Sequence, residues 1–363
     1  MSFINVAYYH MIFFNALLVV TLFAFIQTKT STLDSQSNKS ATNAIGIFLL
    51  TIVLLYIGTR PLNYRFGDMV IYERELEMYR MGEPFDFSKD FLFECLKYFF
   101  AKYLSSESFF FFCAALYIVP LYSVSKKLFK DYWFYAFIMF VTSFSFWAYG
   151  VNGVRNGVAT SIFLYGMTRE NKTTRNAILM STFLFHKSML IPIFAYYLSQ
   201  YYKNTKVLFA FWAMAIPLSF VVGGFFESLF LGFGFGDEKL ELYLGEFDAT
   251  NEGVNIDVGF RWDFLLYSGF GIFAIWYYLF KRKLEDPYYT NMANMYIIAN
   301  TFWVLVIRAN YSNRFAYLSW FMLGLVIIYP LLKRFFFTDQ NKVLGNILLI
   351  YFLFTYLVNI YLS

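Results

Sequence analysis

The chain has 363 residues, of which 59 % are hydrophobic, 24 % are aromatic and only 15 % are charged. Soluble globular chains contain about 25 % charged residues, because a surface in contact with water needs them. The net charge of +5 is small for a protein that binds nucleic acid, and two cysteines and two histidines are too few for a disulfide framework or a multi-histidine metal centre. The composition therefore predicts a polytopic integral membrane protein, whose fold is expected to be all-α, and excludes a multi-histidine metal site and a nucleic-acid partner. We expect no metal ion and no cofactor.

Eleven apolar runs approach the length of about 20 residues that a helix needs to cross a membrane. They must be helices, since open strands in lipid would leave backbone groups without hydrogen bonds. We therefore expect a bundle of about 11–12 membrane helices in one multi-pass domain over residues 1–363. The runs cover residues 7–28, 43–59, 108–125, 132–149, 156–168, 176–199, 207–231, 264–280, 291–308, 314–332 and 343–361.

The basic residues indicate the orientation of the chain. With the N-terminus outside, the inner loops carry 16 of the 29 basic residues and six of the 24 acidic ones, as the positive-inside rule requires. These inner loops are residues 29–42, 126–131, 169–175, 200–206, 281–290 and 333–342. The two long outer loops are then residues 60–107 and 232–263. The first contains FLFECLKYFFAKYL (91–104), which is typical of an amphipathic helix at the membrane interface.

The run 176–199 has basic residues on both flanks, so it must enter and leave on the inner side. Its 24 residues are too few for two complete crossings. We therefore expect two short helices that meet near His186, Lys187 and Ser188. Such broken helices occur where they are buried in protein or line a cavity. One long helix with a polar kink is the alternative.

Charged residues in or beside membrane helices are costly and therefore mark candidate functional sites. Arg60 ends the second run in GTRPLNYRFGD, and Arg65, Asp68 and Tyr72 follow it closely. The alternative reading of this segment is a snorkelling arginine followed by an aspartate that caps a turn.

Arg155 lies one turn inside an otherwise apolar run, and no acidic residue is near it in the sequence. A phosphate or carboxylate of a ligand would satisfy its planar guanidinium group with two hydrogen bonds. A carboxylate from an outer loop is the alternative partner.

His186 lies at the apex of the proposed broken helix, where it could transfer protons if it faces a wet cavity. A hydrogen-bonded packing residue is the alternative.

Arg308 and Arg314 flank a short outer turn, with Tyr317 close by. Two arginines with no acid between them repel each other unless an anion is present. A contact between this turn and the acidic residues of 236–263 is the alternative.

The arginines named above share the outer side, which normally carries fewer basic residues. This shared side predicts a polyanionic ligand there, and a diphosphate on a lipid would fit. Aromatic side chains and the 91–104 helix could hold the lipid tail and stack on sugars.

These segments resemble the EpsG-like family of Wzy-type polysaccharide polymerases. The likeness lies, in the order of the family, in GTRPLNYRFGDMVIY (58–72), VRNGVATSIFLYG (154–166), FLFHKSML (183–190) and NRFAYLSWF (313–321). One departure is that Gly67 directly precedes Asp68, where the family often has a threonine between the two. Carried over by matched position, the functional residues are Arg60, Asp68, Arg155, His186 and Arg314.

The resemblance implies a GT-C-like architecture and an inverting, metal-independent glycosyltransferase. Such an enzyme moves a growing glycan from undecaprenyl diphosphate to another lipid-linked repeat unit, on the outer side of the cytoplasmic membrane. The implied partners are the lipid-linked oligosaccharide, membrane lipid and a chain-length regulator. A glycan ligase and a flippase or exporter of lipid-linked sugars are the alternatives.

The expected catalytic residues are His186, Asp68 and Arg155. His186 is the first choice for the base, Asp68 the second and an acid of 236–263 the third. The residues expected to bind the diphosphate or the substrate are Arg60, Arg65, Tyr72, Arg308, Arg314 and Tyr317.

Overall fold

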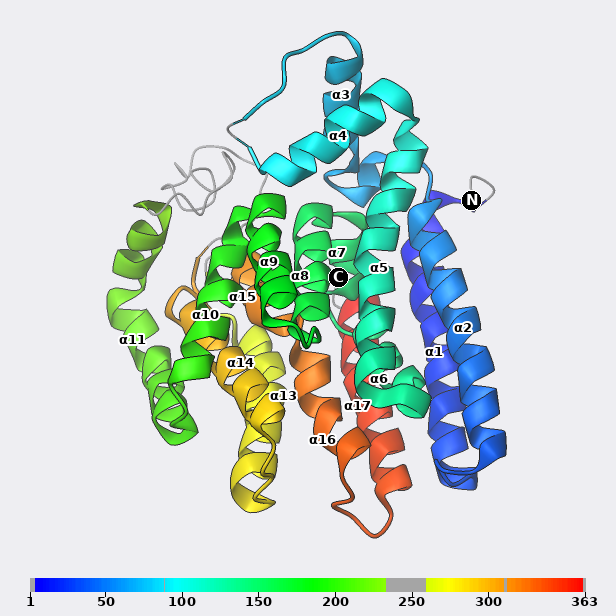
Figure 1. Cartoon of the computed structure of the whole chain (residues 1–363), viewed down its shortest axis with the longest axis vertical. Helices are drawn as coiled ribbons and strands as arrows, with labels where there is room; N and C mark the ends of the chain where they lie inside the picture. The colour runs from blue at the N-terminus through cyan, green and yellow to red at the C-terminus, as the bar shows by residue number, and fades with distance from the viewer. Residues whose placement is uncertain (1–3, 88, 233–258, 310–311, 362–363) are drawn as a thin grey trace. The chain divides into compact units, whose positions relative to one another are not determined.

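The computed structural model describes residues 4–87, 89–232, 259–309 and 312–361 (Figure 1). Every regular element in these ranges is helical. The helices form two compact units, of which unit 1 contains Met1–His186 and Leu331–Ser363, and unit 2 contains Lys187–Pro330. Most of the predicted outer loop 232–263 lies outside the described residues.

Unit 1 begins with two long helices, ends with a third, and contains one long and several shorter helices between them. Its elements are α1 (Val6–Thr30), α2 (Gln36–Gly58), η1 (Tyr64–Phe66), α3 (Met69–Arg80), α4 (Phe91–Tyr103), α5 (Ser106–Phe129), η2 (Lys130–Tyr132), α6 (Trp133–Val141), α7 (Phe146–Val151), α8 (Val154–Met167), α9 (Lys172–Phe185) and α17 (Gln340–Tyr361). Helix α1 packs against α17, and α5 packs against α2 and α8.

Unit 2 is built around α14, which packs against α10, α11, α13 and α15. Its elements are η3 (Lys187–Met189), α10 (Leu190–Tyr201), α11 (Thr205–Gly232), α13 (Trp262–Trp276), η4 (Tyr277–Lys281), α14 (Pro287–Leu305), α15 (Ser312–Trp320) and α16 (Leu323–Lys333), of which η4 is π-helical and α16 continues into unit 1.

Seven of the described helical segments are long and apolar enough to cross a membrane. The chain is therefore a polytopic helical membrane protein, as its composition predicts. These segments are Val6–Thr30, Gln36–Gly58, Ser106–Val141, Thr205–Phe226, Trp262–Lys281, Ser312–Lys333 and Gln340–Ile360.

The prediction of one helix over 132–149 is wrong, because the chain forms α6 and α7 with a break at residues 142–145. Every residue of α6 is buried, as expected for a helix that is apolar on all sides. At the break, the Thr142 hydroxyl donates to the carbonyl of Ile138 at 2.6 Å. Such local side-chain hydrogen bonds compete with helical ones and are common where helices bend or end.

The helix over 156–168 is confirmed as α8, which begins at Val154 and has 14 residues. At 1.5 Å per residue it is about 21 Å long, shorter than the hydrocarbon core of about 30 Å. Its buried side chains include Asn156, Thr160 and Ser161. Helix α8 is therefore an internal helix of unit 1, packed between α5 and α9.

The break predicted in 176–199 is confirmed. Helix α9 ends at Phe185, and His186 has extended backbone angles of φ −160° and ψ 120°. The chain then forms η3 and starts α10 at Leu190. Pro192 lies in the first turn of α10, where its missing N–H costs nothing, whereas its ring would clash with the carbonyl of Ser188 in a continuous helix. The alternative of one long helix is therefore wrong.

Several predicted inner loops lie together within unit 1. Lys127 binds Glu170 at 2.5 Å, Lys39 lies 3.5 Å from Asp131, and Lys333 lies over the ring of Phe129 at 5.7 Å. The loops 29–42, 126–131, 169–175 and 333–342 therefore meet at one end of unit 1. In unit 2 the loops 200–206 and 281–290 come together in the same way, because Lys203 donates to the amide oxygen of nearby Asn291 in α14.

Helices α3 and α4 lie at the other end of unit 1, where α2 ends and α5 begins (Figure 1). Helix α4 confirms the helix predicted over 91–104. Its buried face contains Phe93, Glu94, Lys97, Phe100 and Ala101, at the spacing of one side of a helix. Two of these five residues are charged, so α4 buries ionic as well as apolar groups against its neighbours.

Candidate active site

The segment that follows α2 is held against the end of α7 by hydrogen bonds that each join a side chain to a main-chain group. Arg60 Nη2 donates to the carbonyl of Val151 at 3.3 Å, and the amide of Asp68 donates to Asn152 Oδ1 at 2.9 Å. Gly67 has a φ of +61°, and a Cβ at this position would overlap the Asn152 side chain. Glycine is therefore required at residue 67, for both its backbone conformation and its lack of a side chain.

Arg155 is the second residue of α8, after the N-cap Gly153. A positive charge is unfavourable at a helix N-terminus, where the helix dipole is also positive. Its compensation comes from the segment 60–107, the predicted first outer loop, because Nη1 lies 2.9 Å from Asp90 Oδ2 and Nε donates to the Tyr72 hydroxyl at 3.2 Å. The alternative of an outer-loop carboxylate as the partner of Arg155 is thus the arrangement in the structure.

His186 approaches the same carboxylate. Its Nδ1 atom lies 3.4 Å from Asp90 Oδ2, within ion-pair distance but without the alignment of a hydrogen bond. The Asp90 side chain is only 3 % exposed, and those of His186 and Arg155 are 15 % and 16 % exposed. A nearly buried carboxylate therefore lies between a guanidinium group and an imidazole ring.

We call Tyr72, Asp90, Arg155 and His186 the Asp90 cluster. Its members come from α3, the start of α4, α8 and the end of α9. Tyr72 is itself buried, and its ring packs edge-on against Phe93 of α4 with ring centres 5.3 Å apart. Three of these residues are among those predicted from the sequence, and Asp90 is not.

The position of Asp90 explains why it was missed. It precedes an amphipathic helix, where an aspartate usually caps the helix N-terminus. In the structure Asp90 is the N-cap residue of α4 but its side chain forms no capping hydrogen bond. The absence of any sequence-local partner for Arg155 was the available signal, since it required a carboxylate from elsewhere in the chain.

The other predicted residues of unit 1 lie at varied depths. Arg60 is buried, with 4 % of its surface exposed, and Asp68 is half-buried at the N-cap of α3. Arg65 is exposed on η1. The structure therefore brings Arg60 and Asp68 against the α7–α8 connection and leaves the Arg65 side chain at the surface.

Three predicted residues belong to unit 2. Arg308 is exposed after the end of α14, and Arg314 is half-buried on α15. Tyr317 is 2 % exposed, with its ring centre 6.3 Å from that of Phe321. The acids at 236–258, the third choice for the base, lie outside the described residues, whereas Asp263 forms two hydrogen bonds with Arg261.

A second group of charged side chains connects α3, α4 and the segment between these two helices. Lys97 Nζ lies 2.6 Å from both Glu75 and Glu94, and Lys89 lies 3.2 Å from Glu75. Tyr79 donates to Glu94 at 2.6 Å. We call Glu75, Tyr79, Lys89, Glu94 and Lys97 the Lys97 cluster. It joins α3 to α4, the two helices that carry Tyr72 and Asp90.

Burial alone would raise the pKa of Glu75, but the ammonium groups of Lys97 and Lys89 outweigh this and hold the pKa of its carboxyl below the usual value. The same pairing raises the pKa of Lys89, against the effect of its partial burial. Both shifts favour the charged forms, so the Lys97 cluster is a set of compensated ion pairs at neutral pH.

The arrangement of the Asp90 cluster combines two chemical functions. An imidazole beside a carboxylate can accept a proton, because the carboxylate orients the ring and stabilises its positive form. A guanidinium group beside it can stabilise an anion that forms during a reaction. Such a pair suits a transfer in which a hydroxyl group attacks and an anion leaves.

Residues 46–363 match the EpsG family, so the chain belongs to this family of Wzy-type polysaccharide polymerases. The matched range contains every candidate site residue named above. No curated protein and no solved structure matches the chain.

Proposed function

We propose that this member of the EpsG family transfers a growing glycan from undecaprenyl diphosphate to the non-reducing end of another lipid-linked repeat unit, at the outer side of the cytoplasmic membrane. The observation that supports this proposal is the convergence of His186 and Arg155 on Asp90. It pairs a candidate base with a candidate anion-binding group in one buried site.

In the proposed reaction His186 accepts the proton of the attacking sugar hydroxyl. The hydroxyl oxygen forms a bond to the anomeric carbon of the donor glycan as the bond from that carbon to the diphosphate oxygen breaks. The diphosphate leaves with the bonding electrons, and attack from the opposite face inverts the configuration. Asp90 orients His186 and compensates its positive charge after proton transfer.

Arg155 stabilises the charge that develops on the leaving diphosphate, a role that arginine can fill without a metal ion. Its second partner, the Tyr72 hydroxyl, holds the guanidinium plane in one orientation. We assign Asp68 as the alternative base. By resemblance and charge, Arg60, Arg65, Arg308, Arg314 and Tyr317 bind the diphosphates and sugars, and a chain-length regulator is a further partner.

The test uses purified full-length protein in lipid nanodiscs with a labelled undecaprenyl-diphosphate repeat unit. We expect a ladder of polymer from the wild type and at least a hundredfold slower growth from His186→Gln, since general-base catalysis contributes about 10²–10⁴ in rate. His10→Gln changes the other histidine of the chain, which packs on Phe14 and Trp147 in unit 1, and serves as the matched control.

The same assay separates the alternative functions. Transfer of label to an added second acceptor without a ladder would identify a ligase. Movement of the lipid between leaflets without any transfer would identify a flippase or exporter. A normal ladder from His186→Gln at equal protein level would rule out His186 as the base.

A further inference from the structure

The connection between α7 and α8 carries a polar side chain to which the proposed reaction gives no role. Asn152 is the C-cap residue of α7, and its amide donates to the carbonyl of Ala148 at 2.8 Å. The amide of Gly153, the N-cap residue of α8, donates to the same carbonyl at 3.1 Å. Asn152 is therefore held on a tight turn, and Arg155 follows it by three residues.

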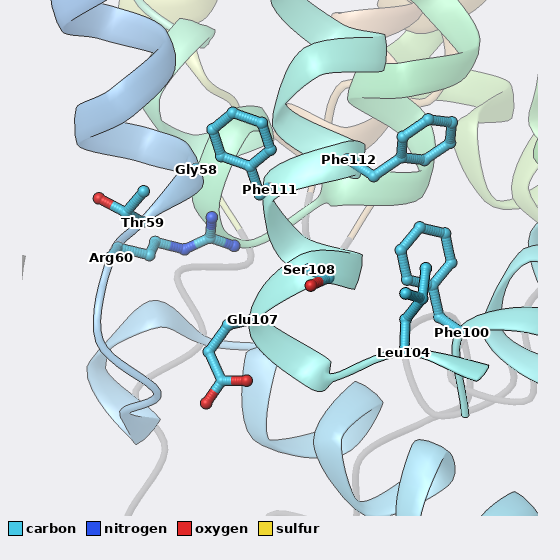
Figure 2. Close-up of a pocket in the computed structure, with 9 residues that line it drawn as sticks. All are labelled: Gly58, Thr59, Arg60, Phe100, Leu104, Glu107, Ser108, Phe111 and Phe112. Carbon is cyan, nitrogen blue, oxygen red and sulfur yellow. The ribbon is translucent and has the colours of Figure 1, made fainter. Parts of the chain in front are cut away.

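Both ends of the segment 60–68 are attached to this turn. Figure 2 shows Arg60 at the end of α2, where its side chain extends toward α5 beside a pocket of about 580 Å³. Its Nη2 atom donates to the carbonyl of Val151 at 3.3 Å. At the other end of the segment, the amide of Asp68 donates to Asn152 Oδ1 at 2.9 Å. The segment is thus fixed to two consecutive residues.

The contact with Asn152 is close as well as directional. The Asn152 side chain packs against Gly67 so tightly that a methyl group on this glycine would displace it. Asp68 is the N-cap residue of α3, so the hydrogen bond from its amide acts on the first residue of that helix. Close packing and one directional hydrogen bond therefore fix the start of α3 relative to α8.

Tyr72 lies one helical turn after this attachment. Its amide donates to the carbonyl of Asp68 at 3.0 Å. Its hydroxyl accepts from Arg155 Nε at 3.2 Å, and the centre of the guanidinium group lies 6.0 Å from its ring. Because Asn152 and Arg155 belong to the same short stretch of chain, these contacts form a closed ring. The position of Tyr72 against Arg155 therefore depends on the attachment at Asn152.

We propose that Asn152 is a positioning residue, which fixes the start of α3 so that Tyr72 holds the Arg155 guanidinium group in the orientation that the transfer requires. The inference rests on the proposed function for its effect on the rate, and it adds to that site a residue outside the Asp90 cluster. A displacement of about 1 Å can cost about a hundredfold in rate, because a preorganised group must meet the charge where it develops.

The test compares two replacements of similar size in purified full-length protein in lipid nanodiscs. Asn152→Leu removes the oxygen that accepts from the Asp68 amide, whereas Asn152→Asp keeps an oxygen in the same place. We expect kcat for polymer growth to fall about tenfold to a hundredfold in Asn152→Leu while KM changes less, since the groups that bind the substrate remain. Asn152→Asp should recover most of kcat.

Asn171→Leu is the matched control. Asn171 is the exposed N-cap residue of α9, at the opposite end of unit 1, and its Oδ1 atom accepts from the amide of Thr174 at 3.0 Å. Its replacement removes the same kind of hydrogen bond and should leave kcat unchanged. Equal losses of kcat in Asn152→Leu and Asn171→Leu would contradict the proposal, because the loss of any hydrogen bond at a helix end would then have the same effect.

Hydrogen exchange measured by mass spectrometry tests the attachment itself, without turnover. In Asn152→Leu, exchange in a peptide covering residues 64–72 should be at least about fivefold faster than in the wild type, a factor that corresponds to the net contribution of one hydrogen bond. Exchange within α5 should not change, and Asn152→Asp should restore slow exchange. Unchanged exchange at 64–72 in Asn152→Leu, or a normal kcat despite faster exchange, would overturn the proposal.

The two measurements also separate this inference from the proposed function. If the wild type makes no polymer, the proposed function fails. Faster exchange at 64–72 in Asn152→Leu, with recovery in Asn152→Asp, would then still support the attachment that holds Tyr72 against Arg155. Polymer growth by the wild type together with a normal kcat in Asn152→Leu would refute the inference and leave the assignment of the Asp90 cluster untouched.

Discussion

The start and the middle of helix α4 carry two buried charged clusters that are compensated to different degrees. In the Lys97 cluster two carboxylates face two ammonium groups, and Tyr79 donates to Glu94, so charge and hydrogen bonding are balanced. In the Asp90 cluster one carboxylate faces both a guanidinium group and an imidazole, whose buried Nδ1 has no hydrogen-bond partner.

This difference separates a structural role from a chemical one. A fully paired ion cluster holds two helices together and gains nothing from a change of protonation. An imidazole beside a carboxylate can gain a proton and remain compensated. We therefore expect the Lys97 cluster to determine stability and the Asp90 cluster to determine activity. Four predictions test this division, from the largest expected effect to the smallest.

Arg155→Ala should slow polymer growth about a thousandfold, in line with the loss of a preorganised group that stabilises a developing anion. The unfolding temperature should also fall, because the buried Asp90 carboxylate loses a cation, so the rates are compared at equal amounts of folded protein. Arg155→Lys keeps the charge without the planar fork and should restore only part of the rate. Growth of the polymer ladder in nanodiscs measures the effect, with the exposed change Arg74→Gln on α3 as control. Equal rates for Arg155→Ala and Arg74→Gln would remove Arg155 from the reaction.

Lys97→Met should cost about 3 kcal/mol of stability, because it leaves the buried Glu94 carboxylate without its cation. Thermal unfolding in detergent measures the loss. Lys102→Met on the same helix changes an exposed lysine that bonds only its neighbour Tyr98, and it should leave the unfolding temperature unchanged. A similar small shift for both variants would show that the Lys97 cluster does not hold α3 to α4.

Asp90→Asn should lower kcat about tenfold to thirtyfold while KM changes less, since Asp90 acts through the orientation and charge of His186. Asp90→Glu restores the carboxylate and should recover part of kcat. Steady-state rates with a soluble acceptor analogue provide both constants. A rise in KM alone, with kcat unchanged, would instead assign Asp90 to substrate binding.

Glu75→Gln should cost about 1.5 kcal/mol at pH 7, the scale of a hydrogen bond to a charged group. The pKa of Glu75 is lowered in the folded protein, so its contribution is fully present above the unfolded value of about 4.3. The contribution is lost as the pH falls through the lower folded value. The difference in unfolding temperature between wild type and Glu75→Gln should therefore shrink from pH 7 to pH 4, and a constant difference would contradict this account.

Much of the fold was predictable because membrane helices follow local rules. The apolar runs predicted the positions of the described membrane-spanning helices. The break before α10 was predicted because the run 176–199 has basic residues on both flanks and too few residues for two complete crossings. The errors fell where a run was long enough to span but buried in protein. The run 132–149 has the composition of a membrane helix, yet it forms the buried α6 and the separate α7. Composition records how apolar a segment is and not whether lipid or protein surrounds it.

For the charged residues, too, the sequence determined some properties and the tertiary structure determined others. The sequence by itself determined that the chain is a membrane protein, that its basic loops should group together, and that Arg155 and His186 were costly enough to need a reason. Only the tertiary structure decided their partner, Asp90, which lies 65 residues before Arg155. Hydrophobicity and helical period are sums over neighbouring residues, whereas the partner of a buried charge depends on which loop folds over it. Because the chain has few charged residues, each one in an apolar segment needed an explanation. The fold brings three of these groups, Asp90, Arg155 and His186, together in one site.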